Sequence, residues 1–236
     1  MYCNEDFSVC QVTTGEGEIN AANSISALAL SPVFDLQKTY FLLAGIAGVN
    51  PKVATLGSVA LARYSVQVAL QYEIDPRSLP DDWPTGYIGY GTKYPHEYPT
   101  VTYGTEVFEV NEKLQEVAFG LASRGRLSNS VKTEGYRAKY RSMGESYKAA
   151  LESPSVVRCD TATSDVYYSG TILSEAFENT TNLWTNGTGE YCMTASEDNA
   201  ALGALLRAAV WGLVDFSRII VMRTGEQLHH NYRKRY

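Results

Sequence analysis

The sequence predicts an α/β fold with a largely parallel sheet at its centre. Short apolar runs rich in β-branched and aromatic residues alternate along the chain with stretches whose apolar residues recur at helical spacing. The chain has 236 residues, of which 44% are hydrophobic, and this is enough to bury one large core. We therefore expect a single domain over residues 1–225, followed by a divergent basic tail over residues 226–236.

The first part of the chain predicts a strand, a helix and further strands in that order. Residues 7–13 alternate and are rich in β-formers, and Gly15 and Gly17 follow them. From Glu18 onward, small and apolar residues recur at helical spacing until Pro32 stops the helix. These features predict a β-turn-α unit. Further strands are expected at residues 39–44, 58–62 and 65–72.

Residues 75–104 predict a long irregular segment, because their many prolines are incompatible with a regular helix or a central strand. A loop of this length is either a cover over a site or a plain surface excursion. After this loop, Asn111 is expected to cap a helix that ends near Gly125. Residues 131–151 predict a polar helical stretch whose charges face solvent.

The last third of the chain returns to alternating elements. Strands are predicted at residues 156–158 and 165–168, and an Asn- and Thr-rich loop at residues 179–189. Residues 194–197, Thr-Ala-Ser-Glu, have the form of a capping box, with a hydroxyl at the cap and a carboxylate three residues later. An amphipathic helix follows them, and residues 218–222 predict a last apolar strand.

The charge balance and the apolar runs exclude several classes of protein. A net charge of −6 argues against a nucleic-acid partner, which requires clustered Lys and Arg. Basic residues cluster only in Arg233-Lys234-Arg235, which we interpret as a solvated terminus. No apolar run approaches the ~20 residues that a membrane-spanning helix needs. The first residues do not resemble a secretory signal, so any such signal would lie outside this sequence.

Four cysteines and two glycosylation triplets bear on the compartment. Cys3 and Cys10 bracket a short polar turn and could close a small hairpin, and Cys159 and Cys192 could form a second disulfide. Free thiols are an equally open alternative. The triplets Asn179-Thr180-Thr181 and Asn186-Gly187-Thr188 favour a secretory or extracellular route.

Two glycine-containing turns are candidates for ligand binding. The first, residues 15–22 (GEGEINAA), lies between the predicted strand and helix. Asn20 occupies the position where the dinucleotide motif has its third glycine, which disfavours a nicotinamide cofactor. The second, residues 45–48 (Gly-Ile-Ala-Gly), directly follows an apolar strand that we expect to be buried on both faces. Ligands of open α/β sheets bind at such strand ends, where small residues let a flat ring approach the backbone. The three scattered histidines lack metal-ligand spacing, and we expect no metal.

Four stretches carry a resemblance to a known family. They are residues 12–22 (VTTGEGEINAA), 41–52 (FLLAGIAGVNPK), 159–171 (CDTATSDVYYSGT) and 193–200 (MTASEDNA). In this order they closely resemble the fungal purine nucleoside permease family, with a match that runs from about Cys3 to Gly225. That family is similar to a distant branch of the nucleoside phosphorylase and nucleosidase fold. The resemblance implies an α/β/α sandwich around a mixed sheet.

The resemblance also implies roles for individual residues. Ala47 and Gly48 match the glycine loop that passes along the base and the ribose. Ser169 and Gly170 precede Leu173, which falls where relatives place an aromatic residue that stacks on the purine; a leucine could still cover the ring. Glu197 matches the carboxylate that accepts hydrogen bonds from the ribose hydroxyls. The alternative for Glu197 is the capping box, and one residue could serve both roles.

Two departures from the family concern catalysis. Relatives of this fold carry a Ser-Asp pair after the last strand as the general acid for the leaving purine. Here Val221–Gly225 is followed by Glu226, a poor substitute because its side chain is longer and its surroundings are unrelated. The family's first strand and phosphate loop have no counterpart before Cys3. We therefore leave the catalytic residues unassigned and expect a fold that is incomplete at both ends, from a shortened gene model, a splice form or a gene remnant.

The expected function is recognition of a purine nucleoside in nucleoside uptake or metabolism. Complete relatives would act at the N-glycosidic bond by phosphorolysis, hydrolysis or ribosyl transfer, without a cofactor but with phosphate as a co-substrate in some of them. Two alternatives stay open: a non-catalytic nucleoside-binding component of transport, and an inactive truncated member of the family. Assembly into a homo-oligomer is compatible with each.

Overall fold

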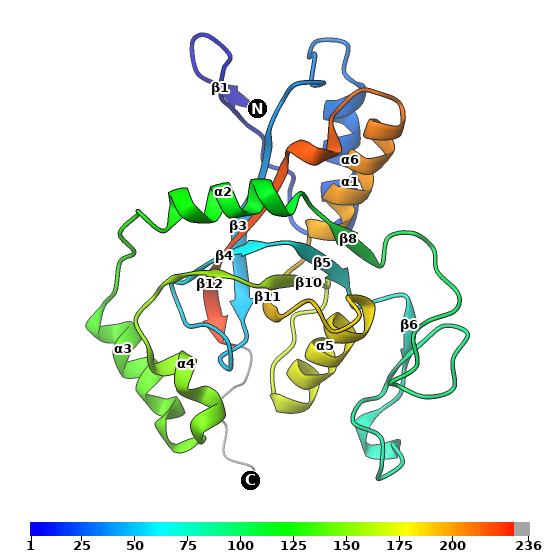
Figure 1. Cartoon of the computed structure of the whole chain (residues 1–236), viewed down its shortest axis with the longest axis vertical. Coiled ribbons are helices and arrows are strands. Elements are labelled where there is room, and N and C mark those ends of the chain that lie inside the picture. The colour runs from blue at the N-terminus through cyan, green and yellow to red at the C-terminus, as the bar shows by residue number, and fades with distance from the viewer. Residues whose placement is uncertain (229–236) are drawn as a thin grey trace.

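The centre of the molecule is one mixed sheet of eight strands, ordered β8-β5-β10-β11-β3-β12-β4-β9 in a computed structural model that describes residues 1–228 (Figure 1). Four of the neighbouring pairs are parallel and three are antiparallel. The mixed sheet that the family resemblance implied is thus present. Its strands are β3 (Phe41–Val49), β4 (Val59–Ala62), β5 (Tyr64–Gln67), β8 (Val107–Glu109), β9 (Val156–Arg158), β10 (Asp160–Thr163), β11 (Tyr191–Ala195) and β12 (Ile219–Leu228).

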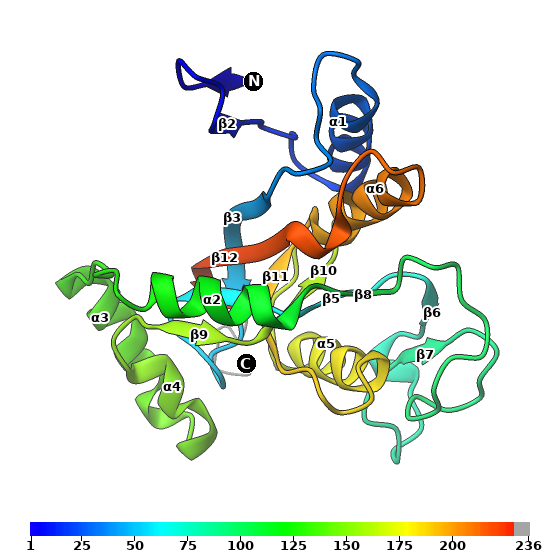
Figure 2. The same ribbon diagram turned by 45° about the horizontal axis from the view of Figure 1, so that its top comes forward.

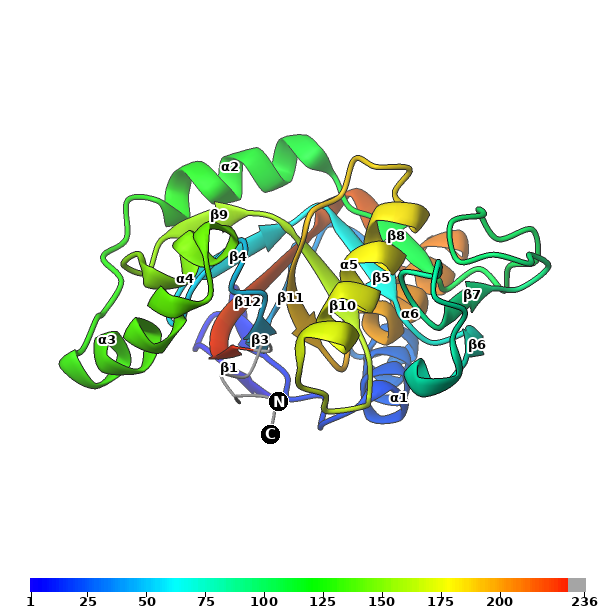
Figure 3. The same cartoon turned by 90° about the horizontal axis from the view of Figure 1, so that it is seen from below.

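Within residues 1–228, six α-helices pack around this sheet. They are α1 (Glu18–Leu30), α2 (Glu112–Ala122), α3 (Val131–Arg137), α4 (Lys148–Leu151), α5 (Thr171–Trp184) and α6 (Asp198–Val210). Helices α1 and α6 lie side by side, and α3 and α4 lie at the end of the molecule opposite to β6 (Gln71–Glu73) and β7 (Tyr87–Gly89) (Figure 3). The largest core cluster joins α1 and α6 to β12 through Ile25, Leu202, Leu205 and Ile219.

The predicted helix starts and stops are confirmed where the periodicity is clear. Helix α1 begins at Glu18 and ends before Pro32, and the Asn111 side chain caps α2 by accepting a hydrogen bond from the Leu114 N–H at 3.2 Å. The polar stretch at residues 131–151 is broken into α3, α4 and the short 3-10 helices η2 (Ala138–Ser142) and η3 (Glu145–Tyr147). Gly144, whose φ of +100° suits few other residues, interrupts it.

Only Cys10–Gln11 of the strand expected at residues 7–13 is extended. The structure instead has a small hairpin of β1 (Tyr2–Cys3) and β2 (Cys10–Gln11), which lies outside the main sheet and stands away from it (Figure 2). A disulfide between Cys3 and Cys10 closes this hairpin. The alternation predicted a strand, but Phe7 is 71% exposed, so its apolar side chain has no core to join.

Strand β3 differs from the prediction in both length and burial. It runs to Val49, so residues 45–48 belong to the strand and do not form a loop. Only one of its faces is buried: Leu42 is 54% and Ile46 63% exposed on the other. The apolar run could not distinguish these cases, because a strand covered on one face and a strand covered on both can have the same composition.

Residues 65–72 split into β5 and β6 at Leu70, whose backbone adopts a φ of +60°. The segment at residues 75–104 is irregular except for β7 and the 3-10 helix η1 (Pro76–Ser78). It packs on α5, where the Tyr98 ring contacts Trp184 edge-to-face at a centroid distance of 5.4 Å. The segment therefore covers part of a helix, and the interpretation as a cover over a site stays a prediction.

Helix α5 and strand β11 were not expected, and the position predicted for β10 is wrong. The strand predicted at residues 165–168 lies five residues earlier, as β10, and residues 179–184 belong to α5 and not to a loop. Asn and Thr have low helix propensity, so the composition of α5 predicted a loop. The helix forms because Phe177, Thr181 and Trp184 are buried against the body of the molecule. Tertiary packing thus overrides local propensity here.

A second disulfide joins Cys159 to Cys192, with 5.8 Å between their Cα atoms, so both pairings considered from the sequence are present. Both cysteines are buried, and the bridge fastens β11 beside the start of β10. Within residues 1–228, no helix is long and apolar enough to cross a membrane. The cluster Arg233-Lys234-Arg235 lies outside the described residues.

Candidate functional site

Glu197 lies between the end of β11 and the first residue of α6, where two neighbours hold its carboxylate. The Gly17 N–H donates to Oε1 at 3.1 Å, and Arg223 Nη2 donates to Oε2 at 3.3 Å. The side chain keeps 21% of its surface exposed. Its carboxylate is therefore fixed in place and still accessible to solvent.

The capping box expected at residues 194–197 is absent. Thr194 and Ala195 are the last residues of β11, and α6 begins only at Asp198 with no side-chain cap. Pairing explains the difference, because Thr194 lies between Ala162 of β10 and Gly48 of β3 and cannot also cap a helix. Of the two roles considered for Glu197, the cap is therefore wrong.

Beneath Glu197, Arg223 of β12 forms a buried ion pair with Asp198. Arg223 Nε donates to Asp198 Oδ1 at 3.0 Å and Nη2 makes a second bond to the same oxygen. The side chains are 7% and 0% exposed. Burial by itself lowers the pKa of the Arg223 guanidinium, but the charges of Asp198 and Glu197 outweigh it and the pKa lies above its ordinary value. The arginine is thus a fixed cation that orients Glu197.

Gly45 is the residue of β3 that makes room for this arginine. It is opposite Arg223 in the parallel pairing of β3 with β12. A Cβ atom at this position would overlap Arg223 Nη1, which also donates to the Ile46 carbonyl at 3.4 Å. From the sequence, Gly45 was expected to let a ligand approach the backbone. In the structure it lets the Arg223 side chain approach instead.

Ala47 and Gly48 lie near the end of β3, next to the strand that leads to Glu197. Ala47 is buried, and Gly48 is the partner of Thr194 in the antiparallel pair of β3 and β11. Thr194 precedes Glu197 by only three residues, so Gly48 lies on the strand next to the one that leads to Glu197.

Ser169, Gly170 and Leu173 form a separate side of the candidate site. Gly170 is the N-cap residue of α5 with a φ of +111°, Ser169 is exposed, and Leu173 is half-buried in the first turn. The preceding Tyr168 hydroxyl approaches β11 through Thr194 Oγ1 at 3.2 Å. This contact connects the start of α5 to β11, the strand that leads to Glu197.

Carboxylates surround this region. The Tyr167 hydroxyl donates to Glu16 at 2.7 Å, and this hydrogen bond, together with the negative charges of Glu16, Glu197 and Glu226, raises the pKa of Tyr167. Glu226 lies on the same strand as Arg223, at a bulge in β12 between Gly225 and Gln227. Because the nearby Arg223 is already paired, the region favours neutral ligands that donate hydrogen bonds over anions.

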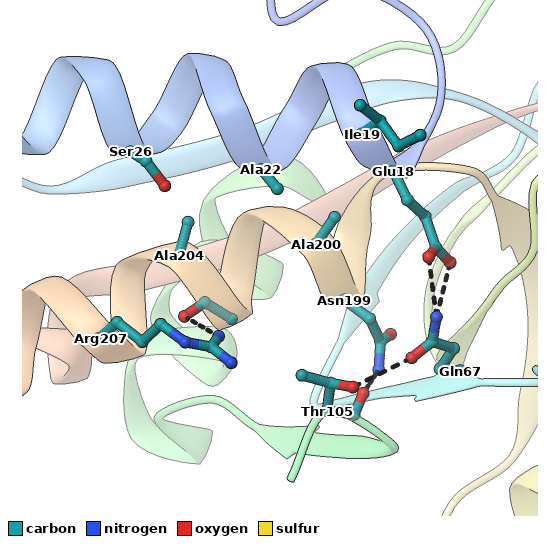
Figure 4. A pocket seen from close by; sticks show the side chains of 11 residues that line it. Glu18, Ile19, Ala22, Ser26, Gln67, Thr105, Asn199, Ala200, Ala204 and Arg207 are labelled. Carbon is teal, nitrogen blue, oxygen red and sulfur yellow. Dashed lines mark hydrogen bonds between the residues drawn. The ribbon is translucent and has the colours of Figure 1, made fainter. Parts of the chain in front are cut away.

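A cavity of about 410 Å³ lies beside this region, between α1 and α6 (Figure 4). Both carboxylate oxygens of Glu18 accept from Gln67 Nε2, at 2.9 and 2.8 Å, and Asn199 Nδ2 donates to the Thr105 carbonyl at 2.7 Å. Burial, followed by the negative charge of Asp165, raises the pKa of Glu18. None of the six residues predicted for the site is among the described residues that line this cavity.

Two residues of the candidate site, Asp198 and Arg223, were missed in the sequence, whereas Gly17 belongs to the first of the two glycine-containing turns and its N–H binds a carboxylate of the protein itself. One signal for Arg223 was available, because it is a charged residue that directly continues the apolar run Ile219–Met222. A charge inside a buried strand usually has a partner of opposite sign. The tandem acids Glu197 and Asp198 are the candidates that such reasoning would have tested.

Comparisons with known proteins agree with the family resemblance. The family model described as purine nucleoside permease (NUP) matches residues 1–235. A purine nucleoside permease of Candida albicans is 52% identical over 227 residues, which cover 95% of this chain and 55% of that protein. A probable purine nucleoside permease of Schizosaccharomyces pombe is 42% identical over 233 residues, covering 95% of this chain and 66% of that protein. This chain thus spans between about half and two thirds of their lengths.

Solved structures share the fold. One of them is the crystal structure of a 5′-methylthioadenosine/S-adenosylhomocysteine nucleosidase from Colwellia psychrerythraea in complex with adenine. The structural match covers 93% of this chain and 65% of the nucleosidase chain. The TM-score is 0.50 and the sequence identity 14%, which establishes a likeness of fold alone. The arrangement of strands and helices is that of a nucleosidase, and the chain belongs to the purine nucleoside permease family.

Proposed function

We propose that this chain recognises the ribose of a purine nucleoside through Glu197, as part of nucleoside uptake or metabolism. The observation that carries the proposal is the arrangement of Glu197, whose carboxylate is accessible and yet held by Arg223 and by the Gly17 N–H. A carboxylate held in place before the ligand arrives binds with a smaller loss of conformational freedom.

The geometry leaves Glu197 with unused acceptor capacity. A carboxylate offers about four lone-pair positions, and one hydrogen bond reaches each of its oxygens in this structure. Each oxygen can therefore accept one more bond. The two neighbouring hydroxyls of a ribose are donors of the right kind, and hydrogen bonds to a charged acceptor are roughly twice as strong as neutral ones.

The base is expected to lie along β3 at Ala47 and Gly48, with Leu173 covering its other face. This placement uses the flat strand beside Glu197 and the half-buried apolar side chain at the start of α5. The surrounding carboxylates support a neutral nucleoside and not a nucleotide, because phosphate groups would be repelled.

Chemistry at the N-glycosidic bond and passage through a secretory compartment are further parts of the proposal. The fold shared with nucleosidases supports cleavage or transfer at that bond, and the carboxylates around the site favour water over phosphate as the acceptor. The disulfides Cys3–Cys10 and Cys159–Cys192 support an oxidising compartment. These points are separable from recognition, since binding requires neither of them.

Calorimetric titration of the chain with adenosine, inosine and guanosine tests recognition. We expect binding of at least one nucleoside and a loss of at least about tenfold in affinity for Glu197→Gln, since a bond to a charged group contributes about 1.5–3 kcal/mol. Glu152→Gln, which changes an exposed carboxylate near α4, is the matched control and should bind normally. Absence of binding for all three nucleosides would contradict the proposal.

An assay for free base in the same samples, with and without phosphate, tests the chemistry. Release of base would assign an activity at the N-glycosidic bond, and dependence on phosphate would identify the acceptor. Binding without release would favour the non-catalytic binding component.

A further inference from the structure

The two glycosylation triplets of this chain lie in different surroundings. Asn179-Thr180-Thr181 lies in the middle of α5, whereas Asn186-Gly187-Thr188 lies in the turn that follows it. An oligosaccharide attached to an asparagine Nδ2 needs open solvent around that atom in the folded protein. The two sites can therefore be compared by burial and by hydrogen bonding.

The first triplet is closed off by packing. Thr180 is 2% and Thr181 0% exposed, and Asn179 is half-buried with its Nδ2 donating to the Pro95 carbonyl at 3.5 Å. This carbonyl belongs to the irregular segment that covers α5. A sugar on Asn179 would displace that segment and expose the helix face beneath it.

The second triplet is open. Asn186 is exposed, with a φ of +52°, in the left-handed region that asparagine tolerates better than most residues. Its backbone is held because the N–H of Gly187 donates to the Asn182 carbonyl at 2.8 Å. In the described part of the chain its side-chain amide makes no hydrogen bond, and Thr188 is also exposed.

A second, independent observation concerns the compartment. All four cysteines are paired in the structure, and disulfides form and persist in the oxidising compartments of the secretory route. Glycosylation of asparagine belongs to the same route. The open triplet and the paired cysteines thus both support passage of the chain through the secretory route.

We propose that Asn186 is an N-glycosylation site and that Asn179 is left unmodified. In the transfer, Nδ2 of Asn186 forms a bond to C1 of a sugar carried on a lipid-linked pyrophosphate. The C1–oxygen bond to that pyrophosphate breaks, the pyrophosphate leaves with the electron pair, and the amide loses one proton. The donor is therefore a lipid-linked oligosaccharide, and no oxidant or reductant is required.

The position of Asn186 keeps the glycan away from the proposed nucleoside site. Leu173 lies in the first turn of α5 and Asn186 just after its last, and 14 helical residues span about 21 Å. We therefore expect the modified and unmodified chains to bind nucleosides equally. The modification depends on the secretory part of the proposed function and is independent of nucleoside recognition.

Translation of the full chain behind a cleavable signal peptide, in the presence of microsomes, tests the proposal. Protease protection selects the translocated chains, and an endoglycosidase-sensitive mobility shift reports the glycan. We expect one shift for the native sequence, its loss in Asn186→Asp and its persistence in Asn179→Gln. Aspartate is chosen at position 186 because it also tolerates the left-handed backbone.

Thr188→Ser supplies the matched control, since it keeps the triplet intact and should keep the shift. The proposal is overturned if protected chains carry no glycan, if the shift survives in Asn186→Asp, or if Asn179→Gln removes it. Failure of nucleoside binding would leave each of these outcomes unchanged, so the two proposals can fail separately.

Discussion

The two sides of the candidate site differ in how firmly the fold holds them. The carboxylate side, comprising Glu197, Asp198, Arg223 and Gly17, is joined by a buried ion pair and by hydrogen bonds that connect α1, α6 and β12. The helix side, comprising Ser169, Gly170 and Leu173, is exposed or half-buried at the start of α5. The difference indicates that the proposed contacts to a ribose are built in advance, whereas the proposed cover over the base is the less constrained part.

The largest expected effect follows from breaking the buried ion pair on the carboxylate side. Arg223→Met leaves Asp198, which is 0% exposed, without its cation. We expect the free energy of unfolding to fall by about 3–5 kcal/mol, because an uncompensated buried charge is costly. Urea denaturation measures this change. Arg223→Met combined with Asp198→Asn should recover part of the loss, and a loss below about 1 kcal/mol in the single variant would show that the pair is not buried in solution.

The two disulfides allow a comparison of a bridge inside the sheet with a bridge outside it. Replacing Cys159 and Cys192 by Ala should lower the free energy of unfolding by about 3 kcal/mol, the typical contribution of a disulfide. This bridge fastens β11, which positions Glu197. Replacing Cys3 and Cys10 should have a much smaller effect on global unfolding, because their hairpin lies outside the main sheet. Equal losses for the two pairs would contradict this account.

Gly45→Ala tests whether the absence of a side chain at this position is what makes room for the Arg223 guanidinium. The new Cβ would overlap the guanidinium, so the arginine must move away from Glu197. We expect a loss of about 1–3 kcal/mol in unfolding free energy, as for other overpacked sites, together with weaker nucleoside binding. Gly120→Ala in α2 is the control, since nothing lies within 4 Å of its Cβ position; it should stabilise the chain by about 0.5–1 kcal/mol. Unchanged nucleoside affinity in Gly45→Ala would show that the position of Arg223 does not matter for nucleoside recognition.

On the helix side we expect a smaller effect. Leu173→Phe would place an aromatic ring where the family resemblance expects one to stack on the base. Aromatic pairs contribute about 0.5–1.5 kcal/mol beyond their buried area, so nucleoside affinity should rise by roughly two- to tenfold. Calorimetry on this variant and on Leu173→Ala, which should bind more weakly, measures the contribution of the cover. Identical affinities in both variants would place the base elsewhere.

The smallest effect concerns pH and the cavity next to the site. Burial and Asp165 raise the pKa of Glu18 above its ordinary value of 4.5, so the folded chain holds this proton more tightly than the unfolded chain. The native chain should therefore lose stability as the pH rises from the unfolded value through the folded one. Glu18→Gln should remove this loss, so the difference in melting temperature between the variant and the native chain should grow from about pH 4 to about pH 7. A constant difference would contradict the assigned cause.

Local patterns in the sequence predicted the elements whose periodicity is strong. Helices α1 and α6 and strand β9 lie where small or apolar residues recur regularly. Helix α5 could not be predicted, because its Asn and Thr residues favour a loop and only tertiary packing makes them helical.

The candidate site was predicted only in part, for a different reason. Glu197 could be named from the family resemblance, but its contact with Gly17 spans 180 positions in the sequence. The partners of Glu197 therefore come from other elements, and no local pattern in one sequence shows which elements will meet. The same limit explains why Gly45 was interpreted as a ligand contact and not as space for Arg223.

The central claim is that Glu197 recognises the ribose hydroxyls, and a cycle of two ligands and two proteins tests it most directly. Inosine and 2′,3′-dideoxyinosine are titrated into the native chain and into Glu197→Gln. The account predicts that the native chain prefers inosine by at least about tenfold and that this preference is lost in the variant, because the hydroxyls then face a neutral group. An equal preference for inosine in both proteins would show that another residue binds the ribose.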